Sequence, residues 1–401
     1  MRLTLSITIL IIAASASGLA EDYFPPADAN GGWRSIQDPA KVRKIAGIDT
    51  ARLDQAFEYA KRTSQHGGVL VVRHGYLVYE RYYGKGNRDA NPTMASVGKA
   101  YTSIASGIML HEKRDKIPLG LEQEVFNAQY LPEALPLSDP MKSTIKLGQL
   151  LAMSSGMTDG GQGFQKGEVR PTKAAPRDPS LSLDQSALRA AMWCKPGEGY
   201  TYSSQSSHVA SIVLRHLVGM EMQQYLDEKL AKPMGWGRWG YGTAEHTPGG
   251  GNIAVRSTDA LRFGYLLLHG GRWGKQQLVP ADYVALCARS SPYNPHSPFS
   301  LQFEVNQDGH VAGAPRDAWF KSGGGGYGIV MIPSLDMVIY KMAGSDAQYD
   351  PQTTKLPMLY KYDGSRDGWK PSVHTQFDDG PIGTDDGLRR LIEMTVAAVI
   401  P

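Results

Sequence analysis

Cysteine is scarce in this chain of 401 residues, which contains only Cys194 and Cys287. Two cysteines form at most one disulfide bond, so the sequence excludes a disulfide-framework fold and a cysteine-rich metal site. The sequence is compatible with one disulfide bond between them and with two buried free thiols. The export inferred below would permit the bond. Neither cysteine has the sequence context of a catalytic thiol, so thiol chemistry is not predicted.

A large excess of charge of one sign is also absent. The chain has 42 basic and 39 acidic residues and a formal net charge of +3, without a basic stripe or an acidic tail. Nucleic-acid binding is therefore not predicted. Hydrophobic residues make up 41% of the chain and charged residues 20%. These proportions indicate a globular protein with one large domain or two moderate ones.

The motifs of two other hydrolase classes are missing. No His-Glu-x-x-His pattern is present, so a zinc hydrolase is not indicated and no metal site is predicted. No serine lies in a Gly-x-Ser-x-Gly elbow, which argues against an α/β-hydrolase. The glycine run that ends at Gly328 resembles a dinucleotide loop only loosely, because it precedes a strand-like segment instead of opening a helix.

Long hydrophobic runs are confined to the N-terminus. Arg2, the apolar segment 3–14 and Gly18-Leu19-Ala20 together predict a signal peptide over residues 1–20, with Ala16 as the second choice of cleavage site. The protein is therefore expected to be periplasmic or secreted. An uncleaved membrane anchor is the alternative, although a span needs roughly 20 apolar residues. No stable membrane span is expected after signal removal.

The pattern along the chain predicts strands near both ends and helices between them. Residues 21–45 are expected to form an extended lead-in. Two β-rich pairs indicate hairpins, 69–73 with 76–82 and 328–332 with 337–341. Apolar periodicity predicts one helix that starts near Asp49 or Thr50. It also predicts helices over about 144–153, 207–217, 222–230, 258–268 and 388–400.

This arrangement favours an α+β fold, in which an antiparallel sheet flanked by helices carries an inserted, mostly helical domain. The catalytic domain is expected over residues 46–401. Its α/β part covers about 46–100 and 250–401, and its helical part covers about 101–249. A site is expected at the seam between the two parts. The oligomeric state is not predicted.

The segment with the clearest chemistry is Ser96-Val97-Gly98-Lys99, which opens an apolar, helix-like run. A serine and a lysine three residues apart on a helix lie on one face, so the amine can take the hydroxyl proton and activate a nucleophile. The spacing alone is weak evidence, because Ser143 and Lys146 share it.

Two later segments complete a catalytic pattern with Ser96. Tyr202-Ser203-Ser204 follows a Pro-Gly-Glu turn, and Lys321-Ser322-Gly323 precedes a strand-like stretch. Lys99 accepts a proton only when it is neutral, which burial and the charge of Lys321 would favour. The same charge would favour the phenolate of Tyr202, so both Lys99 and Tyr202 are candidates for the base. The N–H groups of Ser96 and Gly324 are expected to form an oxyanion hole.

The chain resembles the class C β-lactamase-related serine hydrolases, a group with D-aminopeptidase-like, esterase-like and 6-aminohexanoate-dimer-hydrolase-like members. The resemblance rests on five segments: 94–99, 145–156, the Pro-Gly-x-x-x-x-Tyr-Ser segment 196–203, Gly249-Gly250-Gly251 and 256–259. It implies an acyl-enzyme mechanism on a small-molecule amide, ester or peptide, with no metal or organic cofactor. The substrate contacts that follow from it are Ser204, Ser322 and Gly323.

One departure from the family pattern bears on the substrate. Ser204 stands where the family commonly has the asparagine of Tyr-x-Asn. A hydroxyl is shorter than an amide and has one donor, so simple esters and linear amides are expected to be better substrates than β-lactams. The pocket walls are expected from the loops 158–178 and 349–379. A catalytically weak or inactive penicillin-binding-like sensor or binding protein is the alternative.

Overall fold

The computed structural model describes residues 23–176, 178–242, 245–349, 372 and 387–400. The predicted signal peptide lies outside the described residues, as does the predicted loop 349–379 apart from its residues 349 and 372. Within the described part of the chain, no helix combines the length and the apolar character needed to span a bilayer.

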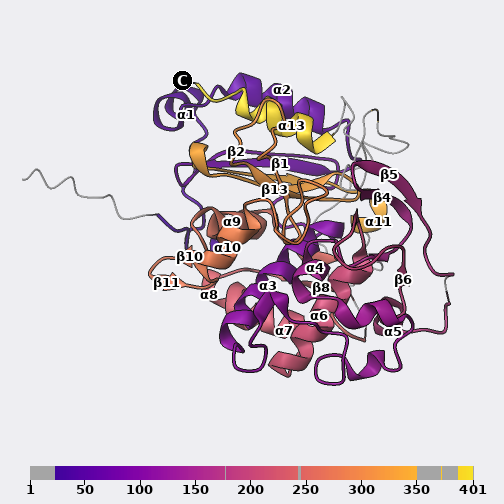
Figure 1. The fold of residues 1–401 in the computed structure, drawn as a ribbon. Coiled ribbons are helices and arrows are strands. Elements are labelled where there is room, and N and C mark those ends of the chain that lie inside the picture. Colours follow the sequence, from indigo (N-terminus) through magenta and orange to yellow (C-terminus); the bar gives the residue numbers. More distant parts are fainter. Residues whose placement is uncertain (1–22, 177, 243–244, 350–371, 373–386, 401) are drawn as a thin grey trace, which may run out of the picture.

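An antiparallel sheet forms the centre of the molecule (Figure 1). Within the described residues it has six strands in the order β12-β13-β14-β15-β1-β2. Their bounds, in that order, are Glu304–Val305, Trp319–Gly323, Tyr327–Ile332, Met337–Met342, Gly67–Arg73 and Tyr76–Tyr83. Both predicted hairpins are therefore confirmed, and the register that places Val71 beside Ile339 joins them into one sheet.

The two faces of the sheet are covered by different layers. One face packs against α2 (Thr50–Ala60) and α13 (Gly387–Val396), and the other against α9 (Ser257–Leu268). Because strand side chains alternate between faces, Phe320, Val330 and Ile339 belong to the core under α2 and α13. Their neighbours Trp319, Ile329 and Tyr340 belong to the core on the α9 side.

The segment between β2 and β9 (Ile253–Val255) builds the mostly helical part that was expected. Its longest helices are α3 (Gly98–Glu112) and α6 (Ser204–Val218), which pack on each other. The shorter elements are α4 (Leu147–Leu151), α5 (Leu183–Leu188), α7 (Met222–Leu226), the π-helical turn Asp227–Ala231 and α8 (Lys232–Met234). The predicted α+β arrangement is confirmed.

Short strands also occur in this mostly helical part. They are β3 (Met157–Thr158), β4 (Gly161–Gln165), β5 (Glu168–Thr172), β6 (Ala191–Met192), β7 (Tyr200–Thr201) and β8 (Trp239–Tyr241). β8 pairs with β9, so a β-ladder crosses the predicted boundary near residue 249. Apart from short 3-10 turns, the remaining described elements are β10 (Arg272–Trp273), β11 (Gln276–Gln277), α10 (Ala281–Cys287) and α11 (Asp346–Tyr349).

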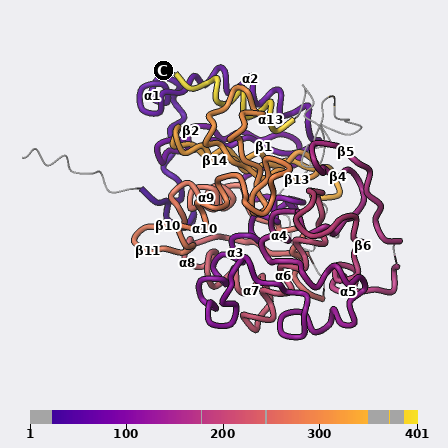
Figure 2. The backbone as a smooth tube through the Cα atoms, in the orientation of Figure 1, coloured from indigo at the N-terminus to yellow at the C-terminus, as the bar shows by residue number. Residues whose placement is uncertain are grey.

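The expectation that residues 21–45 are wholly extended is wrong. Helix α1 covers Pro39–Ala46. Asp38 caps it by accepting a hydrogen bond from the Lys41 N–H at 2.8 Å, and Pro39 occupies the first helical position. This Asp-Pro start is a recognisable helix signal that the composition of the segment obscures. Figure 2 shows α1 beside the C-terminal end, where the Ile400 N–H donates to the Gly47 carbonyl.

The described part of the lead-in is tied to α9 by buried charges. Asp28 accepts hydrogen bonds from Arg262 at 2.6 Å and from Thr258 at 2.8 Å. The Arg262 side chain is fully buried and also pairs with Asp259. Burial raises the pKa of Asp28, but the hydrogen bonds that it accepts and the charge of Arg262 lower the pKa by a larger amount. The pKa of Asp28 is therefore below its ordinary value. These contacts make the N-terminal segment an integral part of the fold.

Lys341 is a fully buried cation at the end of β15. Its Nζ donates to the Gly326 carbonyl at 2.6 Å and to Ser64 Oγ at 3.4 Å. Desolvation lowers its pKa to about 7. The carbonyl that it holds belongs to the turn between β13 and β14, where Gly326 N–H also donates to Gly323.

The shifted pKa of Lys341 predicts a pH dependence of stability. An unfolded lysine titrates near ~10.4, so between about pH 7 and pH 10 the unfolded chain binds more protons than the folded one. The free energy of unfolding of the wild type should therefore rise over this range relative to that of Lys341→Met. Urea titrations at about pH 7 and about pH 9 measure the difference, with Lys146→Met, at a partly exposed lysine, as the control. Parallel pH dependence in all three proteins would contradict the prediction.

Candidate active site

Ser96 lies in a tight turn, Ala95–Val97, immediately before α3. Ala95 has a φ of 45°, a conformation that costs a non-glycine residue about 1–3 kcal/mol and that the surroundings must enforce. They do so through backbone hydrogen bonds: Asn252 N–H donates to the Ala95 carbonyl at 3.0 Å, and Met94 N–H donates to Ile253 at 2.8 Å. The half-buried Ser96 is thus held at the N-terminus of a helix whose first turns are buried.

Lys99 lies one turn into α3 and is fully buried. Its Nζ donates to Ser96 Oγ at 3.0 Å, so the amine reaches the hydroxyl as the spacing predicts. It also donates to the carbonyl of Gly250, which lies 151 residues further along the chain. This loop approaches so closely that a Cβ on Gly98 would lie 2.8 Å from the Gly251 Cα.

Tyr202 brings the second predicted segment to Lys99. It lies between β7 and α6, and Ser203 caps α6 by accepting from the Ser206 N–H. Lys99 Nζ lies 4.8 Å from the centroid of the Tyr202 ring. Lys321 Nζ lies 5.0 Å from the same centroid. The structure therefore places the phenol ring beside both lysines.

Lys321 comes from β13, on the α9 side of the sheet, and is fully buried. Besides Tyr202, its Nζ lies 5.7 Å from the ring of Phe299, which itself contacts Tyr202 edge-on at 6.4 Å. Ser96, Lys99, Tyr202 and Lys321 therefore come together from three distant segments. Two amines beside one phenol are placed to stabilise negative charge that develops nearby.

The glycines after Lys321 lie against the turn that carries Ser96. A Cβ on Gly323 would lie 2.5 Å from the Met94 carbonyl oxygen and 3.1 Å from the Val97 nitrogen. Only glycine permits this approach. Gly324 follows directly, in the turn closed by Gly326 N–H and the Gly323 carbonyl at 3.1 Å. The pairing of the Ser96 and Gly324 N–H groups as an oxyanion hole stays a prediction, as does a substrate contact at Gly323.

The prediction that Ser322 contacts substrate is wrong for its side chain. Ser322 alternates with Lys321 on β13, so its hydroxyl lies on the opposite face of the sheet, under α13. There it is 1% exposed and donates to Glu304 Oε1 at 3.3 Å. Glu304 also faces Arg389 of α13 at 3.5 Å. Ser322 therefore supports the sheet behind the site.

Ser204 opens α6 at the border of the site. The Ser204 N–H donates to Asp159 Oδ2 at 2.6 Å. A Cβ on Gly250 would lie 3.2 Å from the Cβ of Ser204. The residue thus lies next to the loop that holds Lys99, and its predicted contact with substrate stays a prediction. Asp159 also accepts from the Ser203 hydroxyl at 2.9 Å. A carboxylate at the start of α6 complements the helix dipole.

Three neighbours of the site were not singled out from the sequence: Asp159, the Gly250 carbonyl and Phe299. Asp159 lies in a loop far from Ser203 in the sequence. No local sequence pattern therefore indicates that it accepts hydrogen bonds at the start of α6. A carbonyl acceptor has no side-chain signature, although the glycine run 249–251 marks the loop. Phe299 is a lone aromatic residue in a loop, and only the fold places it against Tyr202.

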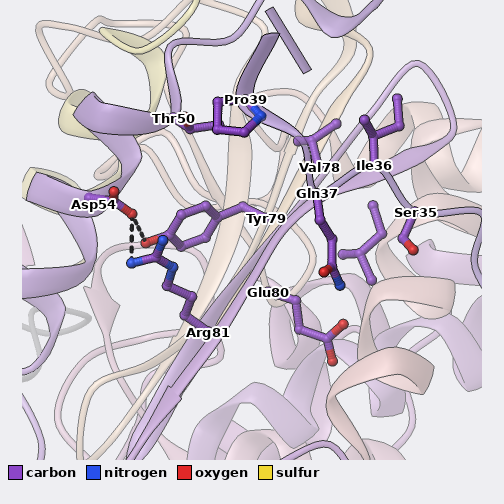
Figure 3. Close-up of a pocket in the computed structure, with 11 residues that line it drawn as sticks. Ser35, Ile36, Gln37, Pro39, Thr50, Asp54, Val78, Tyr79, Glu80 and Arg81 are labelled. Carbon is purple, nitrogen blue, oxygen red and sulfur yellow. Dashed lines mark hydrogen bonds and ion pairs between the residues drawn. The ribbon is translucent and has the colours of Figure 1, made fainter. Parts of the chain in front are cut away.

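Other features of the described residues point to no separate chemistry. Both cysteines are free thiols, and burial raises the pKa of each to about 12. Among the described residues, no group of three or more His, Cys, Asp or Glu side chains is placed to hold a metal ion. Figure 3 shows a polar pocket of about 270 Å³ between β2, α2 and the N-terminal segment. Its charged groups have protein partners: Asp54 accepts from Tyr79 and pairs with Arg81, and Glu80 pairs with Arg88.

Comparison with known proteins places these features in context. The family model described as Beta-lactamase matches residues 53–354. The esterase EstB of Burkholderia gladioli is 27% identical over 227 residues, which is 52% of this chain and 55% of the esterase. The match therefore spans about half the length of that curated relative.

Solved structures agree with the fold. EstCE1, described as a hydrolase with promiscuous acyltransferase activity, gives a TM-score of 0.57 at 19% identity, with 73% of this chain and 93% of EstCE1 covered. A penicillin-binding protein homologue from Caulobacter crescentus gives 0.55 at 15% identity, with 75% of this chain and 95% of the homologue covered. These likenesses confirm the predicted β-lactamase/transpeptidase-like fold. With the family model covering most of its length, the chain belongs to the beta-lactamase family.

Proposed function

We propose that this protein is a serine hydrolase that cleaves an amide or ester bond through an acyl-enzyme intermediate. The observation that carries the proposal is the 3.0 Å hydrogen bond between Lys99 Nζ and Ser96 Oγ, made by a fully buried amine. Family membership and the 27% identity to an esterase support it. Export to the periplasm or beyond is a further proposal, supported by the N-terminal sequence pattern.

In the proposed reaction, Ser96 Oγ attacks the substrate carbonyl carbon while its proton passes to Lys99 or Tyr202. The carbonyl oxygen becomes an oxyanion held by the N–H groups of Ser96 and Gly324. The protonated base then gives its proton to the leaving amine or alcohol, which departs as the acyl-enzyme forms. Water, activated by the same pair, cleaves the new ester and restores Ser96.

The proposed substrates are small amides, esters or peptides, with simple esters and linear amides ahead of β-lactams. Ser204, at the border of the site, supports this order because it lacks the amide that the family commonly has there. Efficient β-lactam turnover would contradict this order of substrates, but it would not contradict the proposal that the protein is a serine hydrolase.

A fluorophosphonate probe and two chromogenic substrates test the proposal on purified residues 21–401. Covalent labelling together with turnover of a p-nitrophenyl ester supports a hydrolase, and a chromogenic cephalosporin ranks lactamase activity against it. Labelling without turnover would instead favour a sensor that acylates once, and failure to label would favour a binding protein.

Lys321 is proposed to bind an anionic group of the substrate as well as to face Tyr202. Removal of its charge in Lys321→Ala should therefore raise KM for a carboxylate-bearing ester about tenfold more than for a neutral ester of the same leaving group. The Lys341→Ala variant, which removes a buried lysine from β15, two strands along the same sheet, is the control. Equal losses for both substrates in Lys321→Ala would remove the proposed carboxylate contact.

A further inference from the structure

His208 is a buried side chain that the proposed mechanism does not use. It lies on α6, is 2% exposed, and has both ring nitrogens within hydrogen-bonding distance of a partner. Nε2 lies 2.9 Å from Asp184 Oδ1, and the backbone N–H of Gly249 points at Nδ1 from 3.0 Å. A backbone N–H is always a donor, so Nδ1 must accept and Nε2 must carry the proton that it donates to Asp184.

The other oxygen of Asp184 is held by a cationic side chain. Arg215, about two turns further along α6, donates to Asp184 Oδ2 at 2.5 Å. Burial raises the pKa of Asp184, but the hydrogen bonds from His208 and Arg215 and the charge of Arg215 lower the pKa by a larger amount. The pKa of Asp184 is therefore well below its ordinary value. The carboxylate therefore stays ionised and keeps the proton of His208 on Nε2.

The glycine that His208 binds belongs to the loop that orients Lys99. Thr102 of α3 donates to the Gly249 carbonyl at 2.8 Å, and Lys99 donates to the next carbonyl, that of Gly250. A Cβ on Gly249 would lie 2.5 Å from Ser211 Oγ, so the loop packs directly between α3 and α6. Two polar contacts, at Gly249 and at Gly250, thus link His208 through this loop to the amine beside Ser96, and Thr102 anchors the loop between them.

We propose that His208 is a positioning residue, whose Nδ1 holds the Gly249 N–H and thereby sets the Gly250 carbonyl that directs Lys99 toward Ser96. The inference rests on the proposed function for its catalytic consequence. The hydrogen bond by which His208 holds the loop 249–251 can be tested without measuring turnover.

Two substitutions separate the two hydrogen bonds of His208. In His208→Asn the amide oxygen replaces Nδ1 as acceptor for Gly249, while the donor to Asp184 is lost. In His208→Gln the longer amide keeps a donor near Asp184, while the acceptor for Gly249 is lost. His216→Gln, on the surface of the same helix and paired with Glu133 at 3.0 Å, is the control.

We expect kcat for the p-nitrophenyl ester to fall about 10- to 100-fold in His208→Gln, since small displacements of a catalytic group have effects of this size. KM should change less than about twofold. His208→Asn should keep most of the wild-type kcat and yet unfold at a lower temperature than His208→Gln, because Asp184 loses a donor. Equal losses of kcat in both variants, or a loss confined to His208→Asn, would overturn the proposal.

Amide hydrogen exchange gives a readout that does not depend on turnover. The Gly249 amide should exchange faster in His208→Gln than in the wild type, His208→Asn or His216→Gln. If the wild type neither labels nor hydrolyses esters but this exchange pattern holds, the hydrolase proposal fails and the role of His208 in the loop stands. Unchanged Gly249 exchange in His208→Gln would overturn the role of His208 itself.

Discussion

Ser96→Ala should abolish fluorophosphonate labelling and lower ester turnover by roughly 10⁴-fold or more, with little effect on thermal unfolding. Loss of the nucleophile leaves only binding and oxyanion stabilisation, which are a small share of the rate of an acyl-enzyme reaction. The hydroxyl is half-buried and accepts a hydrogen bond from the Lys99 amine, which keeps the Gly250 carbonyl as an acceptor when the hydroxyl is removed. Steady-state kinetics and a melting curve of the same preparation measure both effects.

The chain supplies its own control for this substitution. Ser143 and Lys146 have the same spacing as Ser96 and Lys99, but Ser143 Oγ donates to the Pro140 carbonyl and Lys146 pairs with Glu122. Ser143→Ala should therefore leave labelling and turnover at wild-type levels. Full activity in Ser96→Ala, or an equal loss in Ser143→Ala, would contradict the assignment of the nucleophile.

Lys99→Met should produce the second largest loss, about 10³-fold in kcat for the ester. Removal of the amine removes both a hydrogen bond to Ser96 and a candidate proton acceptor, and general-base catalysis contributes about 10²- to 10⁴-fold. Methionine keeps an unbranched apolar side chain in the buried position, so the change tests the amine rather than the packing.

Tyr202→Phe is the natural companion of Lys99→Met, because it keeps the ring between the two lysines and removes only the phenol. A loss as large as that of Lys99→Met would show that the proton passes through both groups. A loss confined to Lys99→Met would assign the base to the amine. Retention of wild-type kcat in Lys99→Met would contradict its proposed role altogether.

Short-range patterns predicted much of the fold. The two hairpins are encoded by β-rich runs around a turn, and α2 starts after its Asp49 cap, so both were predictable without tertiary information. The order of the three catalytic segments predicted that Ser96, Tyr202 and Lys321 would meet. Helix α1 was missed because proline and glycine in the surrounding lead-in outweighed the Asp-Pro start.

Long-range geometry accounts for what the sequence did not predict. Lys321 and Ser322 are adjacent in one motif, yet the alternation along β13 sends them to opposite faces of the sheet. The Gly250 carbonyl and Phe299 reach the site only because distant loops fold over α3 and β13. Ser143 and Lys146 share the spacing of Ser96 and Lys99, but the helical turn of Ser143 ends at Thr144, so the spacing alone does not bring the two side chains together.

The strand order has a consequence for how the chain folds. Because β1 lies between β2 and β15, residue Gly68 acquires its partner Met342 only after most of the chain has been made. Such distant pairings give the molecule a high contact order, which slows folding. Ser96 follows the first hairpin and Lys321 belongs to the late strand β13, so the two meet only once β13 has joined the sheet. A chain interrupted before β13 would carry the proposed nucleophile without Lys321 and the glycines that follow it.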